Sequence, residues 1–198
     1  VKLIRNETSK AQFMRIFAKQ KEWGEPGFYF ADHLSHGSNP CCEIGLNPQL
    51  DIDGEIHTGW QFCNLTEING AKLLSEEDFA IAVRAATIIG TCQAGYTDFP
   101  YLGNVSEELC RREALLGVSI TGMMDQPEIA LNPEIQQRMA ALAIEVNQEI
   151  AKKLNISPAA RLTCVKPAGT TSLLLGTASG IHPRHARRYF RRIQANKQ

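Results

Sequence analysis

The sequence has no long apolar run and no export signal. No segment approaches the roughly 20 apolar residues of a membrane span, and the opening residues VKLIRNETSK lack the apolar stretch of a signal peptide. Of the 198 residues, 43% are hydrophobic and 21% are charged, a composition that excludes a disordered chain. We therefore expect a folded, cytoplasmic protein. Because the sequence starts at Val1, not at a methionine, and within a charged stretch typical of a helix, we expect residues 1–198 to be a single fragment of a longer chain.

Cys-x-x-Cys pairs are absent as well, although the chain contains six cysteines. Without such pairs a structural zinc site is not expected, and we predict no metal ligands. A cytoplasmic chain also disfavours a disulfide framework. Cys92, Cys110 and Cys164 stand in apolar or helical text, and we expect each to be buried as a small hydrophobic residue.

Acidic residues are missing from the end of the chain. None follows Glu149, whereas residues 150–198 carry ten of the 21 basic residues. This asymmetry indicates either an anionic ligand at the basic end or an acidic partner segment elsewhere. No RNP, zinc-finger or helix-turn-helix pattern accompanies the basic residues, so a nucleic-acid polymer is not the expected ligand. The arginine cluster is expected to pair with acidic residues outside the chain: Arg184, Arg187, Arg188, Arg191 and Arg192.

The first half of the chain predicts helices separated by loops. Thr8 would cap a helix that runs to Trp23, and residues 28–30 suit a short strand. Ser75 would begin a second helix, with Asp78 in a capping-box position. The apolar face of that helix is expected to hold Phe79, Ala82, Val83, Ala86 and Ile89.

The second half predicts helices that alternate with short strands. We expect a helix from Ser106 to Leu116, a strand over 117–121, and a helix that Asn132 caps and that ends near Leu154. The inner face of the last helix would hold Ile135, Met139, Leu142, Val146 and Ile150. A strand over 161–165 then leads into a loop of small and hydroxyl residues and an apolar turn over 173–175. This alternation predicts an α/β fold with parallel strand pairing.

Potentially reactive side chains are most concentrated in the segment from Asn39 to Glu43. In an extended segment, residues two apart share a face, so Asn39, Cys41 and Glu43 would point into one cavity. A nearby carboxylate raises the pKa of a thiol, so this arrangement disfavours an anionic cysteine nucleophile and leaves one-electron chemistry at sulfur open. The alternative is a loop in which the two adjacent cysteines have no chemical role.

Four sequence motifs help to decide whether the cysteines of this loop have a chemical role: NPCCEI, FCNLTEI, RREALLGVSITGMMD and VKPAGTTSLLLGTASGIHP. In this order they resemble motifs of the catalytic subunit of ribonucleotide reductases, and their sequences are most similar to those of the adenosylcobalamin-dependent (class II) branch. The resemblance extends from the GEPGFYFAD text at residues 24–32 to the RRYFRRI text near the C-terminus. It implies that the chain is part of a ten-stranded α/β barrel whose central finger loop carries the radical cysteine.

The resemblance also implies roles for individual residues. Cys41 matches the cysteine that becomes a thiyl radical and abstracts the 3′ hydrogen of the ribose. Glu43 matches the base that takes the 3′-hydroxyl proton, and Asn39 matches the amide that holds the sugar hydroxyls. Cys63 matches one half of the redox pair that reduces the 2′ position, with its partner expected upstream of this chain. Cys42 stands at a variable position and receives no catalytic role.

The loop after the last predicted strand is a candidate phosphate site. Free backbone N–H groups at the start of a helical turn attract phosphate oxygens, and the family places the substrate phosphates here. A run of Gly, Thr and Ser is also typical of a simple turn and cap. The candidate residues are Pro167, Ala168, Gly169, Thr170, Thr171 and Ser172.

Two histidines are weaker candidates. His57 and His182 have no second ligand at metal spacing, so we expect both to pack in loops or face solvent.

The resulting hypothesis is reduction of ribonucleoside di- or triphosphates to 2′-deoxyribonucleotides by thiyl-radical chemistry. The resemblance implies adenosylcobalamin, bound largely by segments outside this chain, together with an external dithiol reductant of the thioredoxin kind and the N-terminal remainder of the reductase. The isolated fragment is then expected to be inactive. The alternative is a non-catalytic half of a split reductase that binds its complementary segment. A third possibility, a thiol-dependent redox or metal-binding protein, lacks the necessary spacing of ligands.

Overall fold

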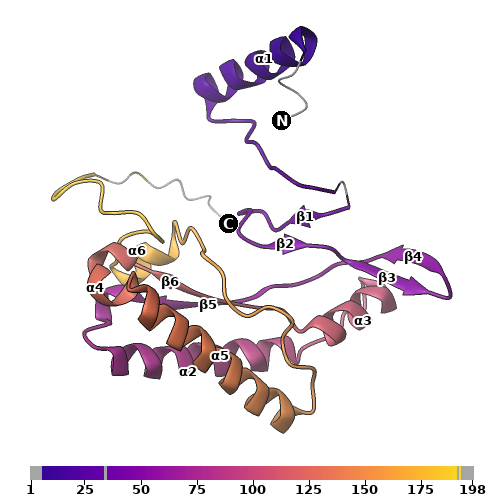
Figure 1. Cartoon of the computed structure of the whole chain (residues 1–198), viewed down its shortest axis with the longest axis vertical. Helices are drawn as coiled ribbons and strands as arrows, with labels where there is room; N and C mark the ends of the chain where they lie inside the picture. The colour runs from indigo at the N-terminus through magenta and orange to yellow at the C-terminus, as the bar shows by residue number, and fades with distance from the viewer. Residues whose placement is uncertain (1–5, 34, 191, 193–198) are drawn as a thin grey trace. The chain divides into compact units, whose positions relative to one another are not determined.

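The computed structural model describes residues 6–33, 35–190 and 192, and the chain divides into two units, residues 1–37 and 38–198 (Figure 1). The first unit is built on helix α1 (Glu7–Trp23). Asn6, rather than the predicted Thr8, caps this helix by accepting the Ser9 N–H at 2.8 Å. Gly24 ends it in the left-handed conformation, with φ of 78°.

The strand predicted over residues 28–30 is not formed. The Phe28 ring instead packs on Phe13 of α1, with ring centroids 5.1 Å apart, and Phe30 is 83% exposed. The aromatic run therefore serves local packing in this unit, because no neighbouring strand pairs with it among the described residues.

A parallel sheet organises the second unit. Strand β5 (Asn64–Asn69) pairs in parallel with β6 (Leu116–Thr121), with Asn64 opposite Leu116. The strand predicted over 161–165 is reduced to a single parallel bridge between Thr163 and Val118, on the other edge of β6. Pro167, which has no N–H to donate, follows shortly after and limits further pairing.

Two long helices cover one face of this sheet. Helices α2 (Glu76–Ala94) and α5 (Pro133–Leu154) lie side by side beneath β5 and β6 (Figure 1). The predicted caps are confirmed, since Ser75 accepts the Asp78 N–H and Asn132 accepts two N–H groups of α5. The core between helices and sheet includes Ile68, Phe79, Val83, Val118, Met139 and Ala143.

The predicted apolar stripe of α2 is confirmed at Phe79, Val83 and Ala86 and differs at its C-terminal end. Ile89 is 56% exposed, whereas Gly90 faces the sheet, where an added Cβ would lie 3.2 Å from the Leu116 side chain. A glycine at this position lets helix and strand approach closely, and this shifts the buried stripe by one residue.

Helix α3 (Gly103–Glu113) begins earlier than predicted, and Ser106 lies inside it rather than at its cap. The Ser106 hydroxyl donates to the Leu102 carbonyl at 3.0 Å and accepts the Trp60 N–H at 3.0 Å. It therefore fastens the helix to the segment that leads into β5.

Several short elements complete the second unit. Strands β3 (Gln49–Ile52) and β4 (Glu55–Thr58) form an antiparallel hairpin, and β1 (Gly37–Ser38) pairs with β2 (Gly45–Leu46). The remaining elements are the 3-10 helices η2 (Gly70–Lys72) and η3 (Met123–Asp125) and the short helices α4 (Pro127–Ala130) and α6 (Thr171–Leu175). The α/β class and its parallel pairing are thus confirmed. No helix among the described residues is long and apolar enough to cross a membrane.

The sheet face turned away from α2 and α5 carries most of the polar side chains and thiols of the sheet. We call it the polar face and define it by the alternating residues Cys63, Glu67, Gly117, Ser119 and Cys164.

Candidate active site

Residues 39–44 form a tight turn rather than the extended segment that was predicted. The Cys42 N–H donates to the Asn39 carbonyl at 2.9 Å, and the Asn39 N–H donates to the Ile44 carbonyl at 3.3 Å. Cys42 has a φ of 61°, which bends the backbone. The Asn39 side chain accepts the Ile44 N–H at 3.2 Å and so closes its own turn. The expectation that alternation aligns Asn39, Cys41 and Glu43 is therefore wrong.

The turn separates Cys41 from Glu43 in exposure. Cys41 is exposed, whereas both Glu43 carboxylate oxygens are buried and make no hydrogen bond with the described residues. Burial raises the pKa values of Cys63, Cys164 and Glu67, and the Glu43 charge raises each of them further. The Glu43 carboxylate is therefore within electrostatic reach of the polar face.

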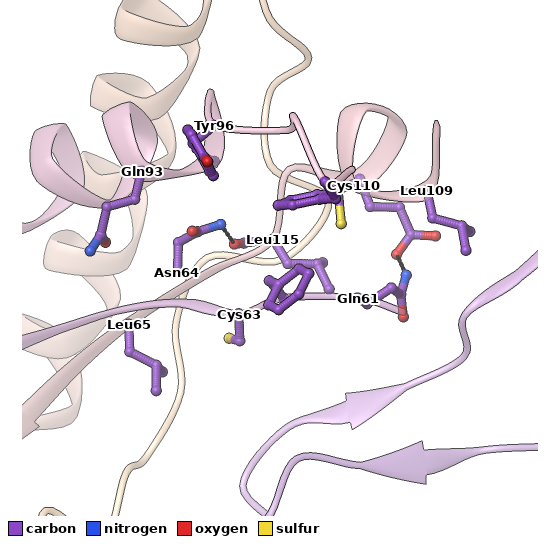
Figure 2. A pocket seen from close by; sticks show the side chains of 13 residues that line it. Gln61, Cys63, Asn64, Leu65, Gln93, Tyr96, Leu109, Cys110 and Leu115 are labelled. Atoms are coloured by element: carbon purple, nitrogen blue, oxygen red, sulfur yellow. Dashed lines mark hydrogen bonds between the residues drawn. The ribbon is translucent and has the colours of Figure 1, made fainter. Parts of the chain in front are cut away.

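Cys63 immediately precedes β5. Figure 2 shows its side chain on the same side of the strand as Leu65 and opposite to Asn64. Burial raises the pKa of its thiol to about 12, with further contributions from Cys164 and Glu43, against which Lys166 acts. The thiol is therefore protonated at neutral pH, which suits donation of hydrogen and not nucleophilic attack.

A glycine brings a second thiol to Cys63. A Cβ built on Gly117 would lie 3.0 Å from Cys63 Sγ and 3.2 Å from Cys164 Sγ. The missing side chain of Gly117 thus leaves the space into which both sulfur atoms point. Burial and the charge of Glu43 raise the pKa of Cys164 to about 11. Cys164 was predicted to be a buried core residue. It is instead half-buried, and its sulfur lies over Gly117 on the polar face.

Glu67 brings a second carboxylate to the polar face. It lies two positions beyond Leu65 on β5, opposite Ser119. Burial raises the pKa of Glu67, and the Glu43 charge adds to this, while Lys166 and the Thr171 hydroxyl lower it. The backbone N–H of Lys166 donates to the Ser119 hydroxyl at 3.0 Å. The backbone of Lys166 is therefore held at the edge of the sheet, and its charge opposes the burial that raises the pKa values of Cys63 and Glu67.

The candidate phosphate loop follows Lys166 directly. Ala168 is buried and has a φ of 51°, and the Ser172 N–H donates to its carbonyl at 3.1 Å. The Ser172 hydroxyl donates to the Gly169 carbonyl at 3.2 Å. Helix α6 has only five residues, and Thr170 makes no side-chain cap. The partial charge of such a short helix is small, so Lys166 is the main cation next to the loop.

A large cavity lies beside Cys63. Its volume is about 580 Å³, and it is lined by residues of the 61–65 segment, α2 and α3. Figure 2 shows Gln61 bonded to Glu113 and the Asn64 amide bonded to the Leu115 carbonyl. Of the predicted site residues only Cys63 lines this cavity. The candidate active site is therefore assigned to the polar face rather than to this cavity.

The other cysteines differ from one another. Cys92 is exposed, contrary to expectation, because Thr91 and Ala94 occupy the buried face of α2 in that turn. Cys110 is half-buried, and its thiol lies 3.7 Å from the Trp60 carbonyl.

The two candidate histidines lie at the surface or beside a carboxylate, and one arginine of the cluster makes a local ion pair. His182 is exposed, and His57 Nε2 lies 3.9 Å from Glu55. Arg184 does not await an absent partner: its guanidinium binds Asp125 through two bonds of 2.9 and 3.1 Å. Arg191 lies outside the described residues. Within the part of the chain that is described, no three Cys, His, Asp or Glu side chains group as a metal site.

Sequence reasoning missed Glu67, Cys164 and Lys166. The alternation of Cys63, Leu65 and Glu67 along FCNLTEI would have placed Glu67 on the face of Cys63. The approach of Cys164 depends on the register of β6 against residues 161–164 and on the space over Gly117, and no local pattern carries that information.

Homologues of this chain are adenosylcobalamin-dependent ribonucleotide reductases. A vitamin B12-dependent ribonucleoside-diphosphate reductase of Mycobacterium tuberculosis is 25% identical over 215 residues, which cover 86% of this chain and 29% of the relative. An adenosylcobalamin-dependent ribonucleoside-triphosphate reductase of Lacticaseibacillus paracasei is 26% identical, with coverage of 80% and 23%. No family model matches the chain.

Solved structures show the same fold. A B12-dependent (class II) ribonucleotide reductase matches 86% of this chain with a TM-score of 0.59 and 22% identity. The alpha subunit of an Actinobacillus ureae class Id ribonucleotide reductase matches 90% with a TM-score of 0.59 and 16% identity. The chain spans 28% and 40% of these two structures, and 29% or less of the two curated relatives.

Proposed function

We propose that this chain forms part of the catalytic subunit of an adenosylcobalamin-dependent ribonucleotide reductase, which converts ribonucleoside di- or triphosphates to 2′-deoxyribonucleotides. One observation carries the proposal beyond the homology. The Glu43 carboxylate, whose oxygens are buried without a hydrogen bond to the described residues, acts electrostatically on the Cys63 thiol at the polar face, although the two come from separate segments. A base and a protonated thiol are the two groups that the reduction requires beside the radical cysteine.

Each residue then has a distinct task. Cys41 carries the sulfur radical that removes the 3′ hydrogen of the ribose and later returns it. Glu43 takes the 3′-hydroxyl proton; its carboxylate oxygens make no hydrogen bond with the described residues that would compete for this role. Cys63 contributes one of the two thiols whose oxidation reduces the 2′ position. Asn39 binds sugar hydroxyls through its amide N–H₂, because its oxygen is engaged in the turn.

Cys164 is the nearest described thiol to consider as the redox partner of Cys63, but the sheet argues against a disulfide between them. Cys63 leads into β5 on one edge of β6, and Cys164 lies on the other edge. Two strand spacings of about 4.8 Å separate their backbones by more than the roughly 7 Å that a disulfide allows. The partner thiol therefore belongs to a segment beyond these residues, as the resemblance implies.

The substrate phosphates are proposed to bind at residues 167–172, next to Lys166. The cation supplies the charge, and the loop supplies backbone N–H groups and hydroxyls. Binding at this end of the polar face would direct the ribose toward Glu43 and Cys63.

The described residues do not fit adenosylcobalamin. The cavity beside His182 and His185 has a volume of about 120 Å³, too small for a corrin ring, and no histidine lines the cavity beside Cys63. We assign no step of these residues to this group. We propose that it binds to segments of the reductase beyond these residues, and that a thioredoxin-like dithiol regenerates the redox pair.

A non-catalytic role remains the second proposal, because the chain spans only 29% and 23% of its two curated relatives. In that role it would bind a complementary segment without turning over substrate. Both proposals place the chain in a larger reductase, and they differ in whether Cys41 reacts.

The test is substitution of Cys41 in the full-length protein that contains these residues. We expect Cys41→Ser to abolish deoxynucleotide formation and to leave nucleotide binding unchanged, because an O–H bond is much stronger than an S–H bond and Ser cannot hold the radical. The adjacent Cys42→Ser, also exposed, is the matched control and should retain activity. Appreciable product from Cys41→Ser would overturn the proposal.

A further inference from the structure

Glu67 is a buried carboxylate to which the proposed chemistry assigns no task. It lies on the polar face, and both of its oxygens are buried without a hydrogen bond of ordinary geometry to the described residues. Burying a carboxylate in this way is unfavourable unless it is protonated or compensated. The presence of this carboxylate next to the proposed phosphate loop therefore needs a physical explanation.

Groups from several segments act on Glu67. It lies opposite Ser119, whose hydroxyl accepts the Lys166 N–H. Burial raises its pKa, Lys166 and the Thr171 hydroxyl lower it, and Glu43 of the 39–44 turn raises it, while the Glu67 charge in turn contributes to the raised pKa of Cys164. Lys166 is the one cation among these groups. The Thr171 hydroxyl belongs to the proposed phosphate loop, so this carboxylate directly adjoins that loop.

A phosphate group bound at the loop changes this charge balance. It adds negative charge beside Thr171 and competes with Glu67 for Lys166. Both effects disfavour the ionised carboxylate, since like charges at short range raise the pKa of an acid and loss of a cation does the same. Burial already raises the pKa of Glu67 in the absence of phosphate, so the group is poised to respond.

We propose that Glu67 takes up one proton from solvent when the phosphate group of a nucleotide binds at Lys166 and residues 167–172. Binding and protonation are then linked, and nucleotide affinity rises as pH falls through the range in which Glu67 titrates. The inference rests on the proposed function for the location of the phosphate. It adds a positioning residue that adjusts Lys166 and the loop to the charge of the substrate.

The experiment measures proton uptake by isothermal titration calorimetry. A ribonucleoside diphosphate is titrated into the full-length protein in buffers of different ionisation enthalpy, between pH 5.5 and 8.5. The same titration is made on Glu67→Gln and on Glu149→Gln, whose carboxylate pairs with Lys153 on an exposed helix face. The ionisation of the diphosphate is common to all proteins, so the difference between proteins isolates Glu67. Lys166→Met identifies the binding that belongs to this loop.

We expect wild type and Glu149→Gln to take up more protons than Glu67→Gln, by up to one per nucleotide. At pH 8 Glu67→Gln should bind more tightly than wild type, by about tenfold for each pKa unit that the phosphate adds, and the difference should vanish at low pH. Thr171→Val provides a second variant: it removes a group that lowers the pKa of Glu67, so its affinity should begin to rise at a higher pH.

Equal proton uptake by wild type and Glu67→Gln would overturn the inference. Nucleotide binding that is unchanged in Lys166→Met would overturn it together with the phosphate site. Neither result touches the radical chemistry, which the separate comparison of Cys41→Ser with Cys42→Ser decides.

Discussion

At the scale of single residues, the protonation of the Cys63 thiol has a measurable consequence. A pKa of about 12 leaves about one part in 10⁴ of the thiol ionised at pH 8, against roughly a quarter for an ordinary cysteine with a pKa near 8.5. Only the thiolate reacts with iodoacetamide. Cys63 should therefore be alkylated about a hundredfold or more slowly than the exposed Cys92 at pH 8.

The sign of the pH dependence follows from the same shift. Because the pKa of Cys63 is raised, its alkylation rate should continue to climb tenfold per pH unit well above pH 9. Peptide mass mapping after timed alkylation reports both cysteines in one sample. Equal rates at Cys63 and Cys92 between pH 7 and 9 would show that Cys63 is not shielded as described.

Substitution of Cys63 separates the redox thiol from the radical thiol. In the full-length protein, Cys63→Ser should still permit 3′-hydrogen abstraction, since Cys41 is intact. The 2′-hydroxyl would leave, but the ketone intermediate would lack a dithiol to reduce it and should decompose with release of free base. Labelled substrate reports both products.

Cys92→Ser is the matched control for this variant, because its thiol is exposed on α2 away from the polar face. It should form deoxynucleotide normally. A normal deoxynucleotide yield from Cys63→Ser with a supplied dithiol would remove Cys63 from the mechanism.

At the scale of elements, one buried amide joins three parts of the second unit. Asn147 of α5 is 1% exposed; it donates to the Thr91 hydroxyl of α2 at 3.0 Å and accepts the Ala159 N–H at 2.9 Å. Asn147→Ala would leave the half-buried Ala159 N–H without its partner and would remove one of the two bonds of the buried Thr91 hydroxyl, which would still donate to the Thr87 carbonyl. We expect a loss of about 1–3 kcal/mol in the free energy of unfolding.

Urea denaturation of the variant measures this loss. The neighbouring Gln148→Ala lies on the exposed face of the same helix and should change the free energy of unfolding by less than about 0.5 kcal/mol. Equal stability of the two variants would mean that the amide does not hold α2, α5 and the 155–160 loop together.

Local sequence signals predicted the helices better than the strands. The caps Ser75 and Asn132 act on backbone groups two or three residues away, so α2 and α5 could be placed from the text alone. The β3–β4 hairpin was not predicted, although its Asp-Gly turn is a typical hairpin signal: Asp53 and Gly54 both adopt positive φ. By contrast, the bend at Cys42 and the space over Gly117 result from tertiary packing that no short pattern encodes.

At the scale of the whole molecule, the polar face needs a cover that the described residues only partly supply. Parallel sheets are normally buried on both faces, and here α2 and α5 cover one of them. Near the proposed phosphate loop, Val165, Leu174 and Ile181 are 52%, 87% and 51% exposed. Apolar side chains exposed beside a functional surface are typical of a contact with a further segment.

We therefore predict that the 198-residue chain alone forms no deoxynucleotide and that a separately produced segment, matching the remaining length of the relatives, restores product when the two are mixed. The physical reason is that the second redox thiol and the cover of the polar face would come from that segment. Product formation is measured with adenosylcobalamin and a dithiol supplied, and a mixture made with Cys41→Ser serves as the control. Turnover by the chain alone would contradict the prediction. Tight association of the two segments without Cys41-dependent product would instead favour the non-catalytic module, since the surface would then be complete and the chemistry still missing.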